Sequence, residues 1–131
     1  MIEDLSGTTS KLVTLALDVA TMRHQVIANN IANANTEGFV PQSVSFEEQL
    51  NEMLLNAPEQ LNDSFVETEL QHLKNRLDSG ENVHNNAESK VQIDMEMARL
   101  AENTIKYQAL LNGLNKYSSI TKMAITLEGA R

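Results

Sequence analysis

Three histidines are the first candidates for chemistry, because imidazole can ligate a metal or exchange a proton near neutral pH. His24, His72 and His84 lie far apart in the sequence, and none has a second ligand at the spacing of a metal site. The segment 78–88 has some of the residues of a calcium-binding loop, but its glycine is the third residue instead of the sixth. The chain has no cysteine for thiolate chemistry. We therefore predict no metal and no cofactor.

The carboxylates do not form a catalytic pair either. Asp94 and Glu96 are two residues apart, so on a helix they would point to different faces. They are better explained as first-turn carboxylates favoured by the helix dipole. The sequence also has no phosphate-binding glycine-rich loop, nucleophile elbow or HExxH zinc motif. We predict that the chain is not an enzyme.

One polar segment has a distinctive pattern: ANNIANANTEGF, residues 28–39, which contains four asparagines. Asparagine is a poor helix former because its amide competes with the backbone for hydrogen bonds. Its repeated use at the end of a predicted helix therefore indicates amides that bond to specific neighbours. A frayed, polar helix end is the alternative.

Two long amphipathic helices would position this segment. Apolar residues at three- and four-residue steps predict a helix over 5–35, which Gly38 and Pro41 would end. Over 91–128 the same steps continue for nearly five heptads, which is typical of a helix packed on another helix. The predicted seam residues are Leu12, Leu15, Val19, Met22 and Val26 in the first helix, and Met97, Leu100, Tyr107, Leu111, Leu114 and Ile125 in the second.

Residues 36–90 form a loop-rich, polar middle segment. Short helices are predicted over 45–55 and 65–77, and 78–90 resembles a flexible loop. We predict a single all-α domain, residues 1–131, in which the terminal helices pair as an antiparallel coiled-coil hairpin capped by the middle segment. Both helices carry more apolar surface than one partner can cover, which predicts self-association or further helices from a partner.

The composition excludes several classes of partner. Acidic residues outnumber Lys and Arg by 18 to 10, giving a net charge of −8, which argues against binding to nucleic acid or anionic lipid. No apolar run approaches the roughly 20 residues of a membrane span, and the N-terminus lacks the pattern of a secretory signal. We expect a soluble chain that would leave the cytoplasm, if it does, without a cleaved signal peptide.

The asparagine-rich segment closely resembles the N-terminal signature of the flagellar rod, hook and hook-filament proteins, the axial components of the bacterial flagellum. The C-terminal part, with Glu96-Met97, Tyr107-Gln108-Ala109-Leu110 and Ala124-Ile125, resembles the proximal rod members of this family; the related rod protein FlgC is the alternative within it. The resemblance covers about residues 8–50 and 91–128. The residues that it marks for assembly are Asn29, Asn30, Ile31, Ala32, Asn33, Asn35, Thr36, Gly38 and Phe39.

The resemblance implies a structural subunit of the proximal rod, in the periplasmic part of the flagellar basal body. Its terminal helices would pair and stack with those of neighbours into a tube that links the membrane ring to the distal rod and hook. The implied partners are other copies of itself, the rod proteins FlgC, FlgF and FlgG, the adaptor FliE, the membrane-ring protein FliF and the flagellar type III export apparatus.

Phe46 and Leu50 match the export-gate element of this family, a phenylalanine followed four residues later by an apolar residue. Simple packing of the two side chains on one helix face explains the pair equally well. A cytosolic helical adaptor or export chaperone is the rival function from another class.

Overall fold

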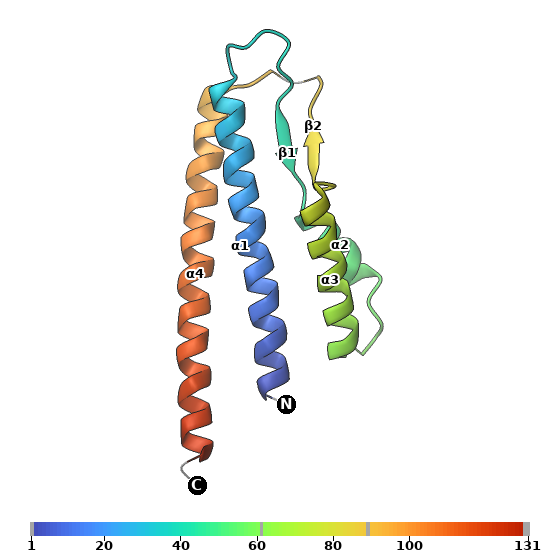
Figure 1. Ribbon diagram of the computed structural model, residues 1–131, viewed down its shortest axis with the longest axis vertical. Coiled ribbons are helices and arrows are strands. Elements are labelled where there is room, and N and C mark those ends of the chain that lie inside the picture. The colour runs from blue at the N-terminus through green and yellow to red at the C-terminus, as the bar shows by residue number, and fades with distance from the viewer. Residues whose placement is uncertain (1, 61, 89, 130–131) are drawn as a thin grey trace.

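Four helices and two short strands make up the computed structural model, which describes residues 2–60, 62–88 and 90–129 (Figure 1). In chain order they are α1 (Ile2–Ala32), β1 (Gln42–Val44), α2 (Glu47–Leu55), α3 (Asp63–Ser79), β2 (Val83–Asn85) and α4 (Ile93–Gly129). The all-α class is confirmed. The long helices begin and end within three residues of the predicted bounds.

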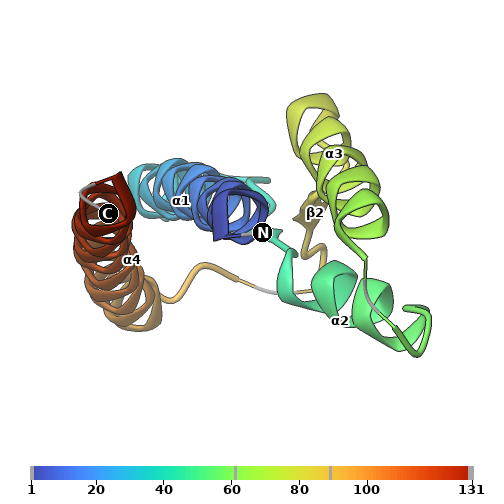
Figure 2. The ribbon, with the colours of Figure 1, turned by 90° about the horizontal axis from the view of Figure 1, so that it is seen from below.

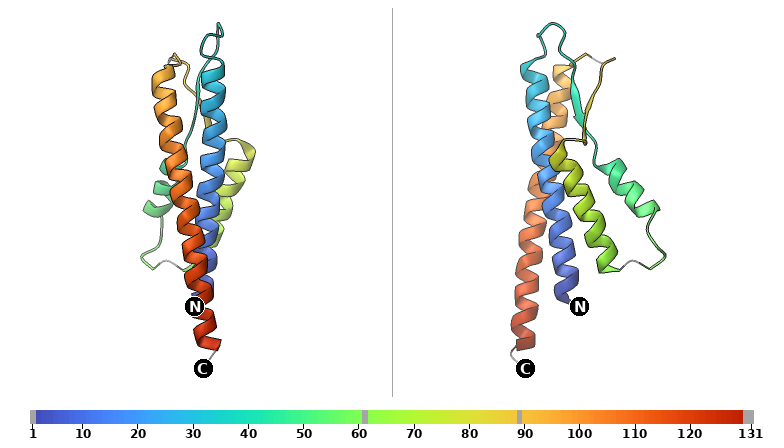
Figure 3. Two further views of the ribbon diagram at one scale, coloured as in Figure 1. Left: turned by 90° about the vertical axis from the view of Figure 1, so that its left-hand side faces the viewer. Right: turned by 45° about the vertical axis from the view of Figure 1, so that its right-hand side comes forward.

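The predicted pairing of the terminal helices is also confirmed. α1 and α4 lie side by side and run in opposite directions, so the two chain ends lie at the same end of the molecule (Figure 1). α4 has 37 residues and α1 has 31. The C-terminal end of α4 extends past the start of α1 (Figure 3).

The middle segment does not cap the hairpin, as the sequence suggested, but lies along one flank of α1. Seen along the long axis, α1 lies between α4 on one side and α3 on the other (Figure 2). β1 and β2 form an antiparallel ladder with Ser43 opposite His84. α2 packs against α3. The middle segment packs on this flank of α1 because the flank carries large apolar side chains that α3 can cover.

The hydrophobic core lies between α1 and this middle segment. It contains Leu15, Val19, Val26, Val44, Phe46, Leu70, Leu73 and Leu77, with Leu12 and Met22 packed at its edge. The α1 residues that we predicted to face α4 therefore face α3 and β1 instead. α1 has a second, smaller apolar stripe that includes Ala20 and Ile27, both buried, and this stripe is left for α4. The bulky stripe packs against the leucines of α3, and the small side chain of Ala20 allows α4 to approach closely.

The segment 78–90, which we predicted to be a flexible loop, contains the end of α3 and β2 within its described residues 78–88 and 90. Gly80 ends α3 with φ 80°, a left-handed conformation that glycine adopts without steric cost. The chain then turns into β2, and the buried side chain of Asn82 donates hydrogen bonds to the Ser45 carbonyl at 2.6 Å and to Gln49 Oε1 at 2.9 Å. These bonds replace the apolar contacts that the segment lacks. They hold β2 against β1 and α2.

Candidate functional site

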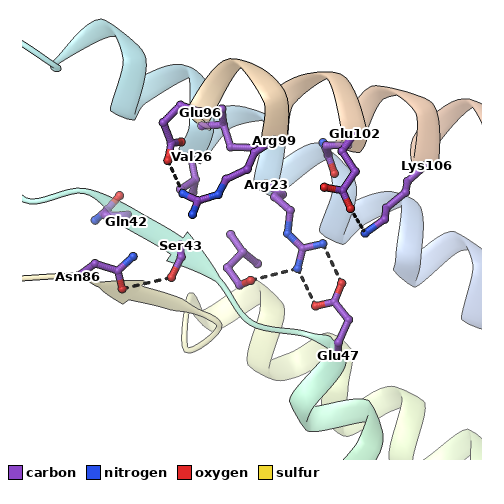
Figure 4. Close-up of a pocket in the computed structure, with 13 residues that line it drawn as sticks. Arg23, Val26, Gln42, Ser43, Glu47, Asn86, Glu96, Arg99, Glu102 and Lys106 are labelled. Carbon is purple, nitrogen blue, oxygen red and sulfur yellow. Dashed lines mark hydrogen bonds and ion pairs between the residues drawn. The ribbon is translucent and has the colours of Figure 1, made fainter. Parts of the chain in front are cut away.

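A network of polar side chains joins α1, β1 and α4 near the closed end of the hairpin. We call Arg23, Asn30, Glu47, Glu96, Arg99 and Asn103 the polar junction. All but Asn30 line a cleft of about 370 Å³, whose further walls come from β1 and α4 (Figure 4). Asn30 lies beside the cleft and bonds to two of the residues in its wall. The junction is thus the place where α1, β1, the start of α2 and α4 meet.

Asn30 is 1% exposed and bonds to the backbone of Gln42 at both ends of its carboxamide. Its Nδ2 donates to the Gln42 carbonyl at 2.8 Å, and its Oδ1 accepts from the Gln42 N–H at 2.9 Å. The ladder to β2 uses the backbone of Pro41 and Ser45, so these two groups of Gln42 point away from β2. Asn30 therefore gives β1 the pair of hydrogen bonds that a neighbouring strand would otherwise give.

Arg23, two helical turns earlier on α1, also bonds to the backbone of β1. Its Nη2 donates to the Val44 carbonyl at 3.0 Å, and its Nη1 and Nη2 bond to the two carboxylate oxygens of Glu47 at 2.9 and 2.7 Å (Figure 4). The hydrogen bond from Arg23 lowers the pKa of Glu47, because it favours the charged carboxylate; burial opposes this effect. One face of α1 thus holds both β1 and the start of α2.

Glu96 connects the junction to α4. The side chain of this residue is 5% exposed, and its Oε2 accepts a 3.3 Å hydrogen bond from Asn30 Nδ2. Its Oε1 accepts a 2.6 Å bond from Arg99 Nη1, one turn further along α4. A buried carboxylate requires such partners, because removal from water is otherwise costly. Asn30 therefore bonds to both β1 and α4.

Asn103 makes the second polar bond between the long helices. It is 4% exposed, and its Nδ2 donates to the backbone carbonyl of Ala20 at 2.8 Å. Glu96 and Asn103 are seven residues apart, which places them on one face of α4. The contact between α1 and the N-terminal part of α4 therefore contains two polar bonds, one at each end of a two-turn stretch of α4.

The other signature residues build the end of α1. Asn33 Nδ2 donates to the Asn29 carbonyl at 2.9 Å and to Asn29 Oδ1 at 3.1 Å, and Thr36 Oγ1 donates to Asn33 Oδ1 at 3.2 Å. Gly38 has φ 76°, in the left-handed region where a side chain would be strained. Ile31 and Phe39 are half-buried, while Ala32 and Asn35 are exposed. These bonds describe a built turn and not a frayed end.

The predicted α4 seam is only partly the surface that faces α1. Leu100, Tyr107, Leu111 and Leu114 are half-buried, but Met97 is 53% exposed and Ile125 is 48% exposed. The buried positions beside them are Glu96 and Asn103. We missed these two residues because we followed apolar side chains only. Their seven-residue spacing, in step with Leu110 and Tyr117, was the available signal.

Phe46 and Leu50 lie together in the folded chain. Phe46 is buried in the core and Leu50 packs against the same cluster. This placement fits the packing explanation of the pair and does not test its role in export.

The three histidines are not brought together. His84 Nε2 lies 2.7 Å from Ser45 Oγ in the β-ladder, and His24 and His72 are exposed. Within residues 2–60, 62–88 and 90–129, no group of three or more His, Asp or Glu side chains is placed to hold a metal ion. Over the same ranges no helix has the length and apolarity to cross a membrane.

Comparison with known proteins gives consistent results. A model of the flagella basal body rod protein family matches residues 16–39. The chain is 32% identical over 124 residues to the flagellar basal body rod protein FlgB of Bacillus subtilis (strain 168), a match that covers 88% of this chain and 91% of the relative. It is 34% identical over 109 residues to FlgB of Borreliella burgdorferi, covering 73% of this chain and 79% of the relative. No solved structure gives a significant match.

Proposed function

The chain belongs to the FlgB family of flagellar basal body rod proteins, and from this premise we propose how it assembles. It is a structural subunit of the rod. We propose that it occupies the proximal rod, where paired α1 and α4 helices stack with those of neighbours into a tube between the membrane ring and the distal rod. The similarity along 88% of the chain carries this proposal.

The surface of α4 supports assembly through the long helices. Large apolar side chains remain exposed along α4, which is unusual for a chain that works as a free monomer. They are Ile93, Met95, Met97, Ile105, Ile120, Met123, Ile125 and Leu127. A largely apolar groove between α1 and α4, lined by Val13, Leu110 and Tyr117 among others, adds to this surface. Contact with further helices would remove this surface from water.

The neighbours proposed for the subunit follow from its place in the rod. They are other copies of the chain, the rod proteins FlgC, FlgF and FlgG, the adaptor FliE and the membrane-ring protein FliF. No enzymatic activity is part of the proposal. The subunit would act through its position in a stack of helices on the periplasmic side of the membrane.

Fractionation of cells tests this proposal directly. A tagged copy that restores motility to a strain lacking the gene should co-purify with detergent-extracted basal bodies. A cytosolic adaptor or export chaperone would instead remain in the soluble fraction. Recovery in the soluble fraction alone, in motile cells, would overturn the rod proposal.

We also propose that Phe46 and Leu50 serve as an export-gate element that is readable only while the chain is unfolded, because Phe46 is buried in the folded core. Val44 is a matched control, since it is buried in the same cluster but lies outside the element. Phe46→Ala and Val44→Ala should both destabilise the fold, the former by about 3–5 kcal/mol. Only Phe46→Ala should reduce secretion in an export assay. Equal secretion of the two variants would contradict the proposal.

A further inference from the structure

α4 offers α1 two alternative contact stripes that share every second position. Both include Leu100, Tyr107, Leu114 and Thr121. The first stripe also contains a heptad row made of Met97, Thr104, Leu111, Ser118 and Ile125. The second stripe contains instead the heptad row made of Glu96, Asn103, Leu110, Tyr117 and Ala124. Successive residues are about 100° apart on a helix, so exchanging the stripes requires α4 to rotate about its axis by roughly 50°.

The structure selects the stripe that contains a carboxylate and a carboxamide. Glu96 and Asn103 are each 4% exposed, whereas Met97 is more than half exposed. At positions 96 and 97, burial of apolar surface alone would favour the opposite choice, because methionine gains from leaving water and a carboxylate loses. In this part of α4, apolar packing therefore does not determine the rotation.

The polar bonds across the contact account for the selection. Asn103 donates to the Ala20 carbonyl, and Glu96 accepts from Asn30, which is itself fixed by two bonds to Gln42. Rotation of α4 by roughly 50° would move the side chains of Glu96 and Asn103 away from α1 and break these bonds. Their donors and acceptors on α1 are directional, so they specify one rotation and one register.

We propose that Glu96 and Asn103 are positioning residues that fix the rotation of α4 and thereby keep Met97 and Ile125 on the outer surface for contacts between subunits. The inference rests on the proposed assembly through the long helices. Its consequence is specific: replacing both polar residues with alanine should let α4 turn the stripe that contains Met97 onto α1, because alanine makes no bond to α1 and buries less apolar surface than methionine. The subunit would remain helical but would lose its assembly surface.

Thiol reactivity of the isolated full chain tests the rotation, because the chain has no native cysteine. Met97→Cys should react quickly with a maleimide and Leu110→Cys slowly, since position 97 is exposed and position 110 lines the groove against α1. In a Glu96→Ala/Asn103→Ala background, the rate at position 97 should fall several-fold and the rate at position 110 should rise. Glu102→Ala/Asn112→Ala is the matched control, as both of those residues are exposed, and it should leave both rates unchanged.

Incorporation into basal bodies tests the consequence. The Glu96→Ala/Asn103→Ala chain, without added cysteines, should be helical by circular dichroism yet absent from purified basal bodies. Unchanged thiol rates would overturn the inference, and so would changed rates with normal incorporation; in both cases a native chain found in basal bodies leaves the proposed function intact. If the double variant does not fold, the same rates measured in Asn103→Ala, with one bond removed, decide the question.

Discussion

Asn30 holds together the closed end of the hairpin, because its carboxamide bonds to the N–H and C=O of Gln42 and to Glu96. Leucine at this position would fit by volume but would leave these buried groups without partners. We expect Asn30→Leu to lower the free energy of unfolding by about 2–4 kcal/mol, because unpaired buried groups cost about 1–3 kcal/mol each. Denaturant titration measures this. Asn35→Leu, at an exposed signature position, should change stability by at most about 0.5 kcal/mol; equal effects of the two substitutions would contradict the role given to Asn30.

Glu47 gives the molecule a defined dependence on pH. Its pKa is lowered by the hydrogen bond from Arg23, so its contribution to stability is present above the ordinary carboxylate pKa and is lost as pH falls through the lowered value. The side chain of Glu47 is 62% exposed, so solvent screening limits the contribution to about 1 kcal/mol or less. Glu47→Gln should therefore be less stable than the wild type at pH 7, and the difference should vanish in strong acid. Unfolding free energies at several pH values measure this; a constant difference would show that the ion pair is not its cause.

Helices and strands differ in how well their sequence predicts them here. The long helices could be predicted because their apolar periodicity extends over many turns, and α3 because Leu70, Leu73 and Leu77 repeat at helical steps. β1 and β2 have three residues each, too few for an alternating pattern to be recognised. They exist because side chains from elsewhere, Asn30 and Asn82, bond to their surroundings.

The candidate site could be predicted only as a segment. The asparagines of the signature marked the end of α1, and Asn30 is indeed at the centre of the junction. Its partners Gln42, Glu96 and Arg23 could not be identified, because hydrogen bonds between distant residues leave no periodic signal in one sequence. The α4 seam was predicted only in part, for a related reason. Apolar spacing on α4 is compatible with two rotations of the helix, and polar bonds decide between them.

At the scale of elements, α4 should be the most easily opened helix of the isolated subunit. Among the described residues, none of the buried core cluster belongs to α4, and much of its apolar surface is exposed. Local opening is easiest where few buried apolar contacts are lost. Hydrogen exchange should therefore be faster for the amides of α4 that follow Asn103 than for the amides of α3 around Leu73. Incorporation into rods should slow the exchange of α4; slower exchange in α4 than in α3 in the free subunit would contradict this order.

Across the whole molecule, the negative charge is concentrated in the middle segment. Ten of the 18 acidic residues but only three of the ten Lys and Arg lie between residues 47 and 90. Residues 91–131, which include α4, contain four acidic and five basic residues. α4, which we propose to pack against neighbours, is therefore nearly neutral, while the flank formed by α2 and α3 would repel the same flank of another copy.

This distribution predicts that salt promotes self-association of the isolated subunit. The Debye length shortens from about 30 Å at 0.01 M to about 8 Å at 0.15 M, which screens repulsion between the acidic flanks. Sedimentation velocity should show more association at the higher salt concentration. Glu48→Gln/Glu52→Gln removes two exposed charges from α2 and should raise association at low salt and weaken its salt dependence. Glu102→Gln/Glu128→Gln removes the same number from α4, where charges nearly balance, and should leave the salt dependence in place. If the two pairs behave alike, total charge and not its location controls association, and repulsion between the acidic flanks is not the cause of the salt dependence.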